Sequence, residues 1–399
     1  MVRKHTFILT IFIMVALLAN IASGNEVHEP EYNLPDPLVL QNGEPVIDET
    51  TWFKERRPEI LELFREHVYG RRPGPPDGIK FESTDLDTEA LDGTATLRRI
   101  NIILQQGSKS HSFEVYVFIP NAVKTPAPLF LLTQAIDLGP NRSFGFWPFE
   151  MVIDRGYAIG GIHLHDVAAD NSAEFRNGVI SLFDDIETER ASDAWGGLAA
   201  WGWAASRALD YFETDRSIDE SRVVLLGHSR GGKAALWGGA EDQRVAIAIS
   251  NQSGCGGAAL SRRKFGERIS VITHEDVFHY WFCPNFKKYA DNESALPVDQ
   301  HMLIALMAPR PVYVASAEED HWADPLGEFL SAYYANPVYK LLGKQGLPVD
   351  TQPAPGEVAH GTIGYHIRSG EHDLLVEDWQ HYLDFADLHF GIQADLDQK

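Results

Sequence analysis

VVLLGHSRGGKAAL, residues 223–236, is the stretch that decides the fold prediction. Four apolar residues lead into Gly-x-Ser-x-Gly, and the residues after it have helical composition. This order predicts a buried strand, a sharp turn at Ser229 and a helix, which is the setting of a nucleophile elbow. Small residues on both sides let strand and helix approach closely, and the helix start offers N–H groups to a developing oxyanion. We therefore expect Ser229 to be a nucleophile; the alternative is a capping serine in an ordinary turn.

Segments with strand and helix patterns alternate around this elbow. Strands are predicted at residues 97–104, 113–119, 129–132, 157–164, 246–250, 311–316 and 362–367. Helices are predicted at residues 52–69, 194–212 and 374–390, the second of them capped by Ser192 and Asp193. This alternation predicts an α/β protein with a mainly parallel sheet covered by helices on both faces. Because no linker divides the chain after residue 50, residues 51–399 are expected to form one domain.

The first 50 residues differ from the rest in composition. Arg3 and Lys4 precede an apolar stretch at residues 7–18, and Ala-Ser-Gly at 22–24 offers a cleavage site, so residues 1–24 are predicted to be a secretory signal. A membrane anchor is the alternative, although the apolar stretch is short for a span. Residues 25–50 carry many acids and prolines and are predicted to be an exposed lead-in.

Net charge and cysteine content limit which partners and which cellular compartment are expected. The signal carries two cations and no acid, so its removal takes the net charge from −23 to −25. Such a surface repels nucleic acid and anionic lipid, so we expect neither as a partner and expect a secreted or periplasmic monomer. The only cysteines, Cys255 and Cys283, could pair in an exported protein or stay as two buried thiols, and the sequence leaves both open.

A serine nucleophile needs a base, which is expected near the end of the chain. In folds with this elbow the order along the chain is Ser, acid, His, which places the base between the last strand and the last helix. His360, His366 and His372 compete for this role. His372 is favoured because it follows the predicted strand at 362–367, at the carboxyl end where sites in open α/β sheets lie.

The acid that orients the base is expected after the strand at 311–316. Several carboxylates follow that strand, and Asp320 is favoured over Glu319, while Asp324 is expected to cap a turn. A second position for an acid, after the strand at 246–250, holds no carboxylate but Gln252. The loop at residues 137–149, rich in glycine and aromatic residues, is expected to help build an oxyanion hole or a substrate wall.

Two clusters could be taken for metal ligands. They are His163, His165 and Asp166 at a strand end, and His274, Glu275 and Asp276 with His279. Neither has a third well-spaced partner, so no metal site is expected.

Several motifs together are specific: Gly-His-Ser-Arg-Gly-Gly-Lys at 227–233 and the segments 253–263, 296–301, 308–311, 320–325 and 364–374. Through these motifs the chain resembles the glucuronoyl esterases, carbohydrate esterase family fifteen, over most of its length after the signal. Ser-Arg-x-Gly-Lys is much narrower than Gly-x-Ser-x-Gly. The resemblance implies the α/β-hydrolase fold, no metal or cofactor, and hydrolysis of esters between (4-O-methyl-)glucuronate of xylan and alcohols of lignin.

The resemblance also implies roles for individual residues. Arg230 would support the oxyanion and Lys233 would bind hydroxyls of the uronate ring, while Glu267 and Trp322 would line the sugar site. Two cations beside the serine of a very acidic protein suit an anion-forming acyl centre.

This sequence differs from part of the family at a position that can hold the acid of the triad. Many members carry Glu at the position of Gln252, so here the charge that stabilises the imidazolium must come from elsewhere, for which Asp320 is favoured. Two other functions stay open: an acetyl esterase acting on decorated polysaccharides, and a non-catalytic carbohydrate-binding homologue.

Overall fold

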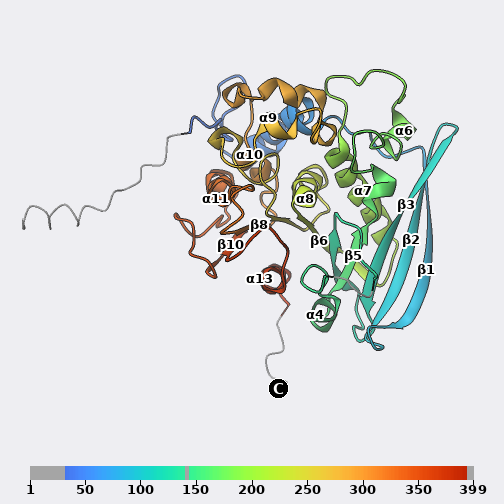
Figure 1. Cartoon of the computed structure of the whole chain (residues 1–399). Helices are drawn as coiled ribbons and strands as arrows, with labels where there is room; N and C mark the ends of the chain where they lie inside the picture. The colour runs from blue at the N-terminus through green and yellow to red at the C-terminus, as the bar shows by residue number, and fades with distance from the viewer. Residues whose placement is uncertain (1–31, 140–142, 393–399) are drawn as a thin grey trace, which may run out of the picture. The chain divides into compact units, whose positions relative to one another are not determined.

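The strands of the protein form a ten-stranded sheet in the residues that the structure, a computed structural model, describes: 32–139 and 143–392 (Figure 1). The strand order is β1-β2-β3-β5-β4-β6-β7-β8-β10-β9. All neighbouring pairs from β5 to β10 in this order are parallel, while β3 meets β5 and β9 meets β10 antiparallel. The strands are β1 (Gly78–Ala90), β2 (Ala95–Gln106), β3 (Lys109–Pro120), β4 (Ala127–Leu132), β5 (Ala158–Ile162), β6 (Ile218–His228), β7 (Ile247–Asn251), β8 (Val312–Ala317), β9 (Val358–His360) and β10 (Ile363–Arg368).

Helices cover both faces of this sheet. α4 and α13 lie on one face, and α7, α8, α10 and α11 on the other (Figure 1). The α-helices are α2 (Glu49–Thr51), α3 (Arg57–Phe64), α4 (Phe149–Asp154), α5 (Leu164–Val167), α6 (Ile180–Phe183), α7 (Gly197–Phe212), α8 (Arg230–Glu241), α9 (Ile269–Ile272), α10 (Gln300–Ala305), α11 (Pro325–Tyr334), α12 (Asn336–Leu341) and α13 (Val376–Phe390). The π-helical turns η1 (Trp52–Arg56) and η2 (Arg65–Tyr69) flank α3, and short 3₁₀ turns are η3 (Ser261–Arg263), η4 (His279–Trp281), η5 (Pro284–Tyr289) and η6 (Glu293–Ala295).

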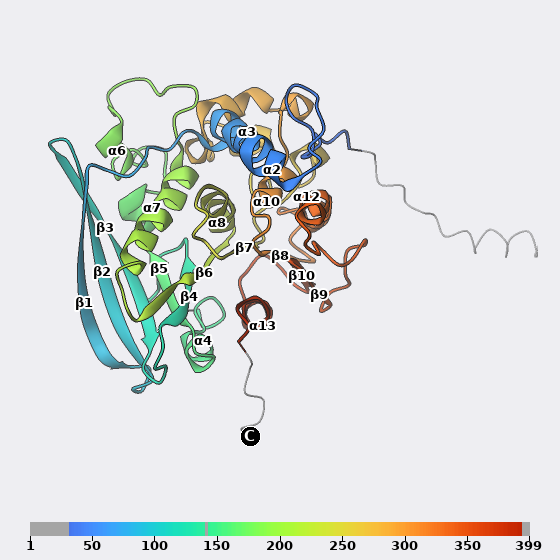
Figure 2. The ribbon, with the colours of Figure 1, turned by 180° about the vertical axis from the view of Figure 1, so that it is seen from behind.

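The central strands are apolar on both sides because both of their faces are covered. On β6, Val223 and Leu225 pack into the core that contains α7 and α8, whereas Val224 and Leu226 pack into the core that contains α4 and α13. This explains the continuous apolar run before the elbow, which a half-exposed strand would not show. Figure 2 shows the antiparallel strands β1 to β3 at one edge of the sheet and β9 at the other.

The predicted alternation of strands and helices is confirmed, with changes at element ends and with further elements that were not predicted, among them β9, α4 and α11. β5 ends at Ile162, before the predicted end at residue 164. The predicted cap of the Trp-rich helix was wrong: α7 is capped by Gly196, without a side-chain hydrogen bond. The reason is close packing, since a Cβ on Gly196 would lie 2.3 Å from the carbonyl oxygen of Trp281. Asp193 instead accepts a hydrogen bond from Arg71 Nε at 2.6 Å.

The predicted lead-in at residues 25–50 is not exposed throughout. In its described part Leu40 and Val46 are buried. The carbonyl of Pro35 accepts a hydrogen bond from His301, and Arg56 donates to the carbonyl of Pro37. The described residues from Leu34 onward belong to one compact unit, so the packed body begins before residue 51. The predicted signal at 1–24 lies outside the described residues; within them, every helix is too short or too polar to cross a membrane.

Candidate active site

Ser229 occupies a tight corner between β6 and α8. Its backbone has φ 56° and ψ −126°, a conformation that residues other than glycine rarely adopt. A Cβ on Gly227 would lie 2.1 Å from the carbonyl of Gly231, so the second glycine of the motif sits directly against the first. The elbow predicted from the sequence is therefore present, and its glycines are needed because strand and helix are in contact.

His372 lies on the loop between β10 and α13 and is bonded to a buried acid. Its Nδ1 is 2.6 Å from Asp320 Oδ2, and Asp320 Oδ1 accepts the N–H of Ala323 at 3.1 Å. Asp320 is 4% exposed, whereas the neighbouring Glu319 is an exposed residue. Of the two favoured acids, Asp320 is thus the one that contacts the imidazole.

The other two histidines considered as the base have partners inside the fold. His366 Nε2 is 2.8 Å from Asp378 Oδ1, and its Nδ1 is 2.9 Å from the hydroxyl of Tyr313. His360 Nε2 lies 3.5 Å from the same hydroxyl. Both therefore belong to the packing of β8, β9 and β10 against α13.

His228, the residue before Ser229, adds a second imidazole that sequence reasoning did not assign. Its ring centroid lies 4.4 Å from that of His372. Its Nδ1 is 2.6 Å from Asn251 Oδ1, and the amide nitrogen of Asn251 donates to Tyr382 at 2.7 Å. Because the Asn251 oxygen accepts, His228 carries its proton on Nδ1. Burial lowers the pKa of His228 to about 4, so a neutral imidazole lies against His372.

Gln252 holds the loop that carries His372 rather than the imidazole ring itself. It is buried, its φ is 49°, and its side-chain oxygen accepts the N–H of Asp373 at 2.9 Å. This bond ties the loop after β7 to the residue that follows His372. Gln252 thus serves as a backbone anchor for the loop that carries His372.

A cleft of about 480 Å³ opens at the elbow. Its walls include Gln134, Asp170, His228, Ser229, Arg230 and His372. Gln134 follows β4, and its side-chain oxygen accepts the N–H of His228 at 3.1 Å. The loop at residues 137–149 was predicted to help build an oxyanion hole or a substrate wall. Its Phe146 ring meets that of His228 edge-on at 5.7 Å, but its described residues are not among those that line this cleft.

A larger hollow of about 570 Å³ lies elsewhere, at the other end of β7. Its arginines, Arg244 and Arg310, are bonded to groups of the protein itself. It contains none of the predicted site residues, so the smaller cleft is the candidate active site.

Arg230 reaches from the start of α8 along the cleft wall. Its guanidinium forms an ion pair with Asp170 and lies over the ring of Trp281, with 4.8 Å between the guanidinium carbon and the ring centroid. Asp170 was not predicted as a site residue, because its contact with Arg230 joins positions 60 residues apart.

A buried ion pair is formed by Lys233 and Glu267, which were predicted as sugar-binding residues. Lys233 lies on α8, one turn after Ser229. Lys233 Nζ lies 2.5 Å from Glu267 Oε2 and also donates to the carbonyls of Ser253 and Cys255, each at 2.6 Å. All three ammonium protons are therefore bonded within the protein. Burial raises the pKa of Glu267, against the opposing effect of the Lys233 cation.

Trp322 adjoins this pair on the surface. Its side chain is 51% exposed, and its carbonyl accepts the N–H of Glu267 at 2.7 Å. Lys233, Glu267 and Trp322 are thus brought together, but none of them lines the 480 Å³ cleft.

The remaining predictions concern metal ligands and cysteines. Among the described residues no group of three or more His, Cys, Asp or Glu side chains is arranged to hold a metal, and the clusters at 163–166 and 274–279 are no exception. Cys255 and Cys283 are buried free thiols, the second of the two states left open by the sequence. Cys255 contacts Ser261, and Cys283 donates to the carbonyl of Glu66.

The mainly parallel sheet with a nucleophile elbow between a central strand and its helix defines the α/β-hydrolase fold. A family model described as glucuronyl esterase of fungi matches residues 102–343. A carbohydrate esterase from an unknown prokaryotic organism is 39% identical over 398 residues, covering 92% of this chain and 91% of its own. A 4-O-methyl-glucuronoyl methylesterase of Wolfiporia cocos is 31% identical over 79% of this chain and 74% of its own.

A solved structure supports the same relationship. The glucuronoyl esterase from Solibacter usitatus matches with a TM-score of 0.84 and 40% identity, over 92% of this chain and all of that one. The chain belongs to the glucuronoyl esterase family and is accordingly a carboxylic ester hydrolase.

Proposed function

We propose that this protein is an exported, monomeric serine esterase that cleaves esters between (4-O-methyl-)glucuronate of xylan and alcohols of lignin. The observation that carries the proposal is a strained elbow at Ser229 that lines the same cleft as His372, which is bonded to Asp320, in a chain of this family. The Wolfiporia cocos relative is named for its action on 4-O-methyl-glucuronoyl methyl esters. The predicted signal at residues 1–24 supports export.

In the first step Ser229 Oγ attacks the ester carbonyl of the uronate, and His372 Nε2 takes the hydroxyl proton. Asp320 fixes the tautomer through Nδ1, leaving Nε2 as the base, and stabilises the imidazolium that forms. The backbone N–H of Arg230 and its guanidinium hold the negative oxygen of the tetrahedral intermediate. His372 then protonates the leaving alcohol, which departs as the acyl-enzyme forms.

In the second step water attacks the acyl carbon. His372 accepts a proton from that water and returns it to Ser229 Oγ when the second tetrahedral intermediate breaks down to the free glucuronate. Every proton transfer uses residues of this chain.

The sugar is proposed to bind beside the nucleophile, where Lys233, Glu267 and Trp322 meet. The buried pair of Lys233 and Glu267 supplies a donor and an acceptor close to α8, and the exposed Trp322 ring offers a face for a sugar. Because Lys233 has its donors occupied, uronate hydroxyls would have to share or replace one of these bonds.

The experiment that tests the proposal compares two ester classes. We expect kcat/KM for methyl or benzyl glucuronate, relative to the uncatalysed rate, to exceed that for p-nitrophenyl acetate. Lys233→Ala should reduce the uronate reaction more than the acetate reaction, because only the uronate carries ring hydroxyls. A preference for acetate would favour the acetyl esterase alternative, and no labelling of Ser229 by a serine-hydrolase probe would favour a binding protein.

A further inference from the structure

We propose that Asp170 is a positioning residue that holds the Arg230 guanidinium in place for the oxyanion. The inference rests on the proposed function, which gives Arg230 that role. It concerns a residue on the loop after α5, well separated in sequence from the elbow, from the base and from the acid.

Arg230 needs such a support because its side chain is long and 39% exposed. A free arginine side chain samples many rotamers, and this conformational entropy would have to be lost when the oxyanion forms. Here one guanidinium nitrogen, Nη1, donates to Asp170 Oδ2. The group also lies over two aromatic rings, with its carbon 4.8 Å from the centroid of Trp281 and 5.3 Å from that of Phe278.

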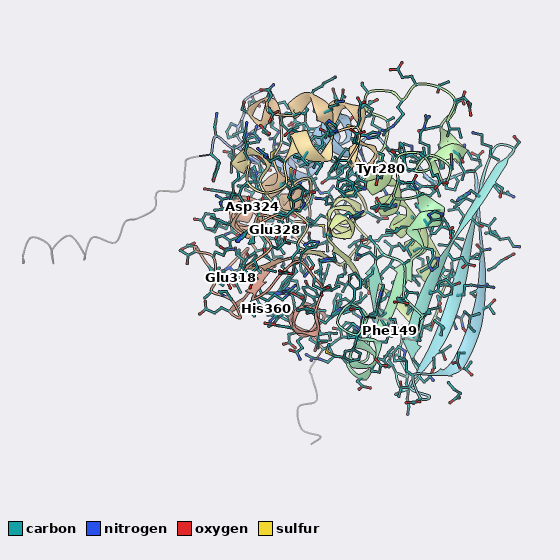
Figure 3. All side chains as sticks on the ribbon, viewed as in Figure 1. Phe149, Tyr280, Glu318, Asp324, Glu328 and His360 are labelled. Atoms are coloured by element: carbon teal, nitrogen blue, oxygen red, sulfur yellow. The ribbon has the colours of Figure 1, made fainter. Side chains whose placement is uncertain are left out.

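Asp170 is itself fixed by the segment that supplies those rings. Its Oδ1 accepts the indole N–H of Trp281 at 2.8 Å and the hydroxyl of Tyr280 at 2.9 Å. One carboxylate oxygen therefore faces two aromatic donors while the other faces Arg230. Tyr280, labelled in Figure 3, belongs to the η4 turn, which packs against α7.

The consequence for catalysis is preorganisation. The guanidinium has five N–H donors, and the ion pair engages Nη1, which leaves donors on Nε and Nη2 for the cleft. With Asp170 in place these donors stand in position before the negative oxygen forms, so less reorganisation is needed in the transition state. Asp170 should therefore act on kcat, and only through Arg230.

A double-mutant cycle tests this dependence. Arg230→Ala, Asp170→Asn and the double variant are compared with the parent, using both methyl glucuronate and p-nitrophenyl acetate. We expect Asp170→Asn to lower kcat about 10-fold with KM within about 2-fold, and to change kcat less than 2-fold when Arg230 is already Ala. Additive effects of the two changes, an unchanged kcat or an increased kcat for Asp170→Asn would each overturn the proposal.

Two controls separate positioning from folding. Asp219→Asn removes a carboxylate that is 2.6 Å from Arg222 on β6, away from the cleft, and should leave kcat unchanged. Trp281→Phe keeps a ring but removes the N–H bond to Asp170, and should lower kcat in the same direction by a smaller factor. If the effects of Asp170→Asn and Arg230→Ala on p-nitrophenyl acetate hydrolysis are coupled but methyl glucuronate is not cleaved, the proposed function alone is refuted. If methyl glucuronate is cleaved but the two effects are not coupled, this inference alone is refuted.

Discussion

Ser229 is held in a backbone conformation that costs on the order of 1 kcal/mol or more for a residue with a Cβ. Ser229→Ala keeps that Cβ and removes only the hydroxyl that we propose as the nucleophile. We expect it to fold like the parent and to lose esterase activity by several orders of magnitude. Residual activity within tenfold of the parent would contradict the nucleophile assignment.

The same strain gives a second expectation for this position. Ser229→Gly also lacks the hydroxyl but relieves the φ of 56°. It should unfold at a higher temperature than Ser229→Ala in a thermal scan, although both are inactive. The opposite order would mean that the elbow geometry is not under strain.

The proposed role of Asp320 as the acid is tested together with substitutions at Glu319 and Gln252. Asp320→Asn keeps the shape of the buried side chain that contacts His372 but removes its charge, so kcat should fall by roughly 10²-fold or more. Glu319→Gln changes an exposed residue and should leave kcat within about 2-fold. Gln252→Ala should cost less than Asp320→Asn, since Gln252 holds the backbone of Asp373. An unchanged kcat for Asp320→Asn would mean that the loop after β8 does not take part in the mechanism.

At the scale of elements, α13 packs on β9 and β10 through a group of histidines. His360 lies near Tyr313 and Phe385, and His366 and His381 have ring centroids 4.6 Å apart. Burial lowers the pKa of His360 from 6.5 to about 4, and it also lowers the pKa of His381. The loop that carries His372 leads directly into α13, so the stability of this packing matters for the site.

These shifts predict how stability depends on pH. Between pH 6.5 and about 4 the unfolded chain binds a proton at residue 360 that the folded chain does not, so acidification lowers the free energy of unfolding. His360→Asn should make that decline shallower in urea titrations at several pH values. The matched control His274→Asn, at a side chain that is 60% exposed, should follow the parent. Parallel curves for the parent and His360→Asn would contradict the prediction.

At the scale of the whole molecule, the sequence predicted what depends on local pattern and chain order. The elbow follows from adjacent residues, and the pairing of His372 with Asp320 follows from where acid and base fall after successive strands. The cap of α7 could not be predicted, because Gly196 is selected by contact with Trp281. The bonds of Asp170 to Arg230 and of Asn251 to Tyr382 join positions 60 and 131 residues apart, and no local pattern marks them.

The net charge of the whole chain gives the last prediction. Acids outnumber bases by 23, so even complete ion pairing would leave unpaired carboxylates that repel one another in the folded state. Exposed ion pairs contribute about 0–1 kcal/mol each, so screening them costs little, whereas screening the repulsion favours the compact state. We therefore expect the unfolding temperature at pH 7.5 to rise by a few degrees when NaCl is increased from about 10 mM to about 150 mM.

A pH control separates screening from other effects of salt. Near pH 5.0, the isoelectric point calculated from the sequence, the net repulsion is small and the same addition of NaCl should leave the unfolding temperature nearly unchanged. An equal rise at both pH values would point to preferential exclusion of salt from the surface. A fall at pH 7.5 would mean that the ion pairs contribute more to stability than the excess of carboxylates takes away.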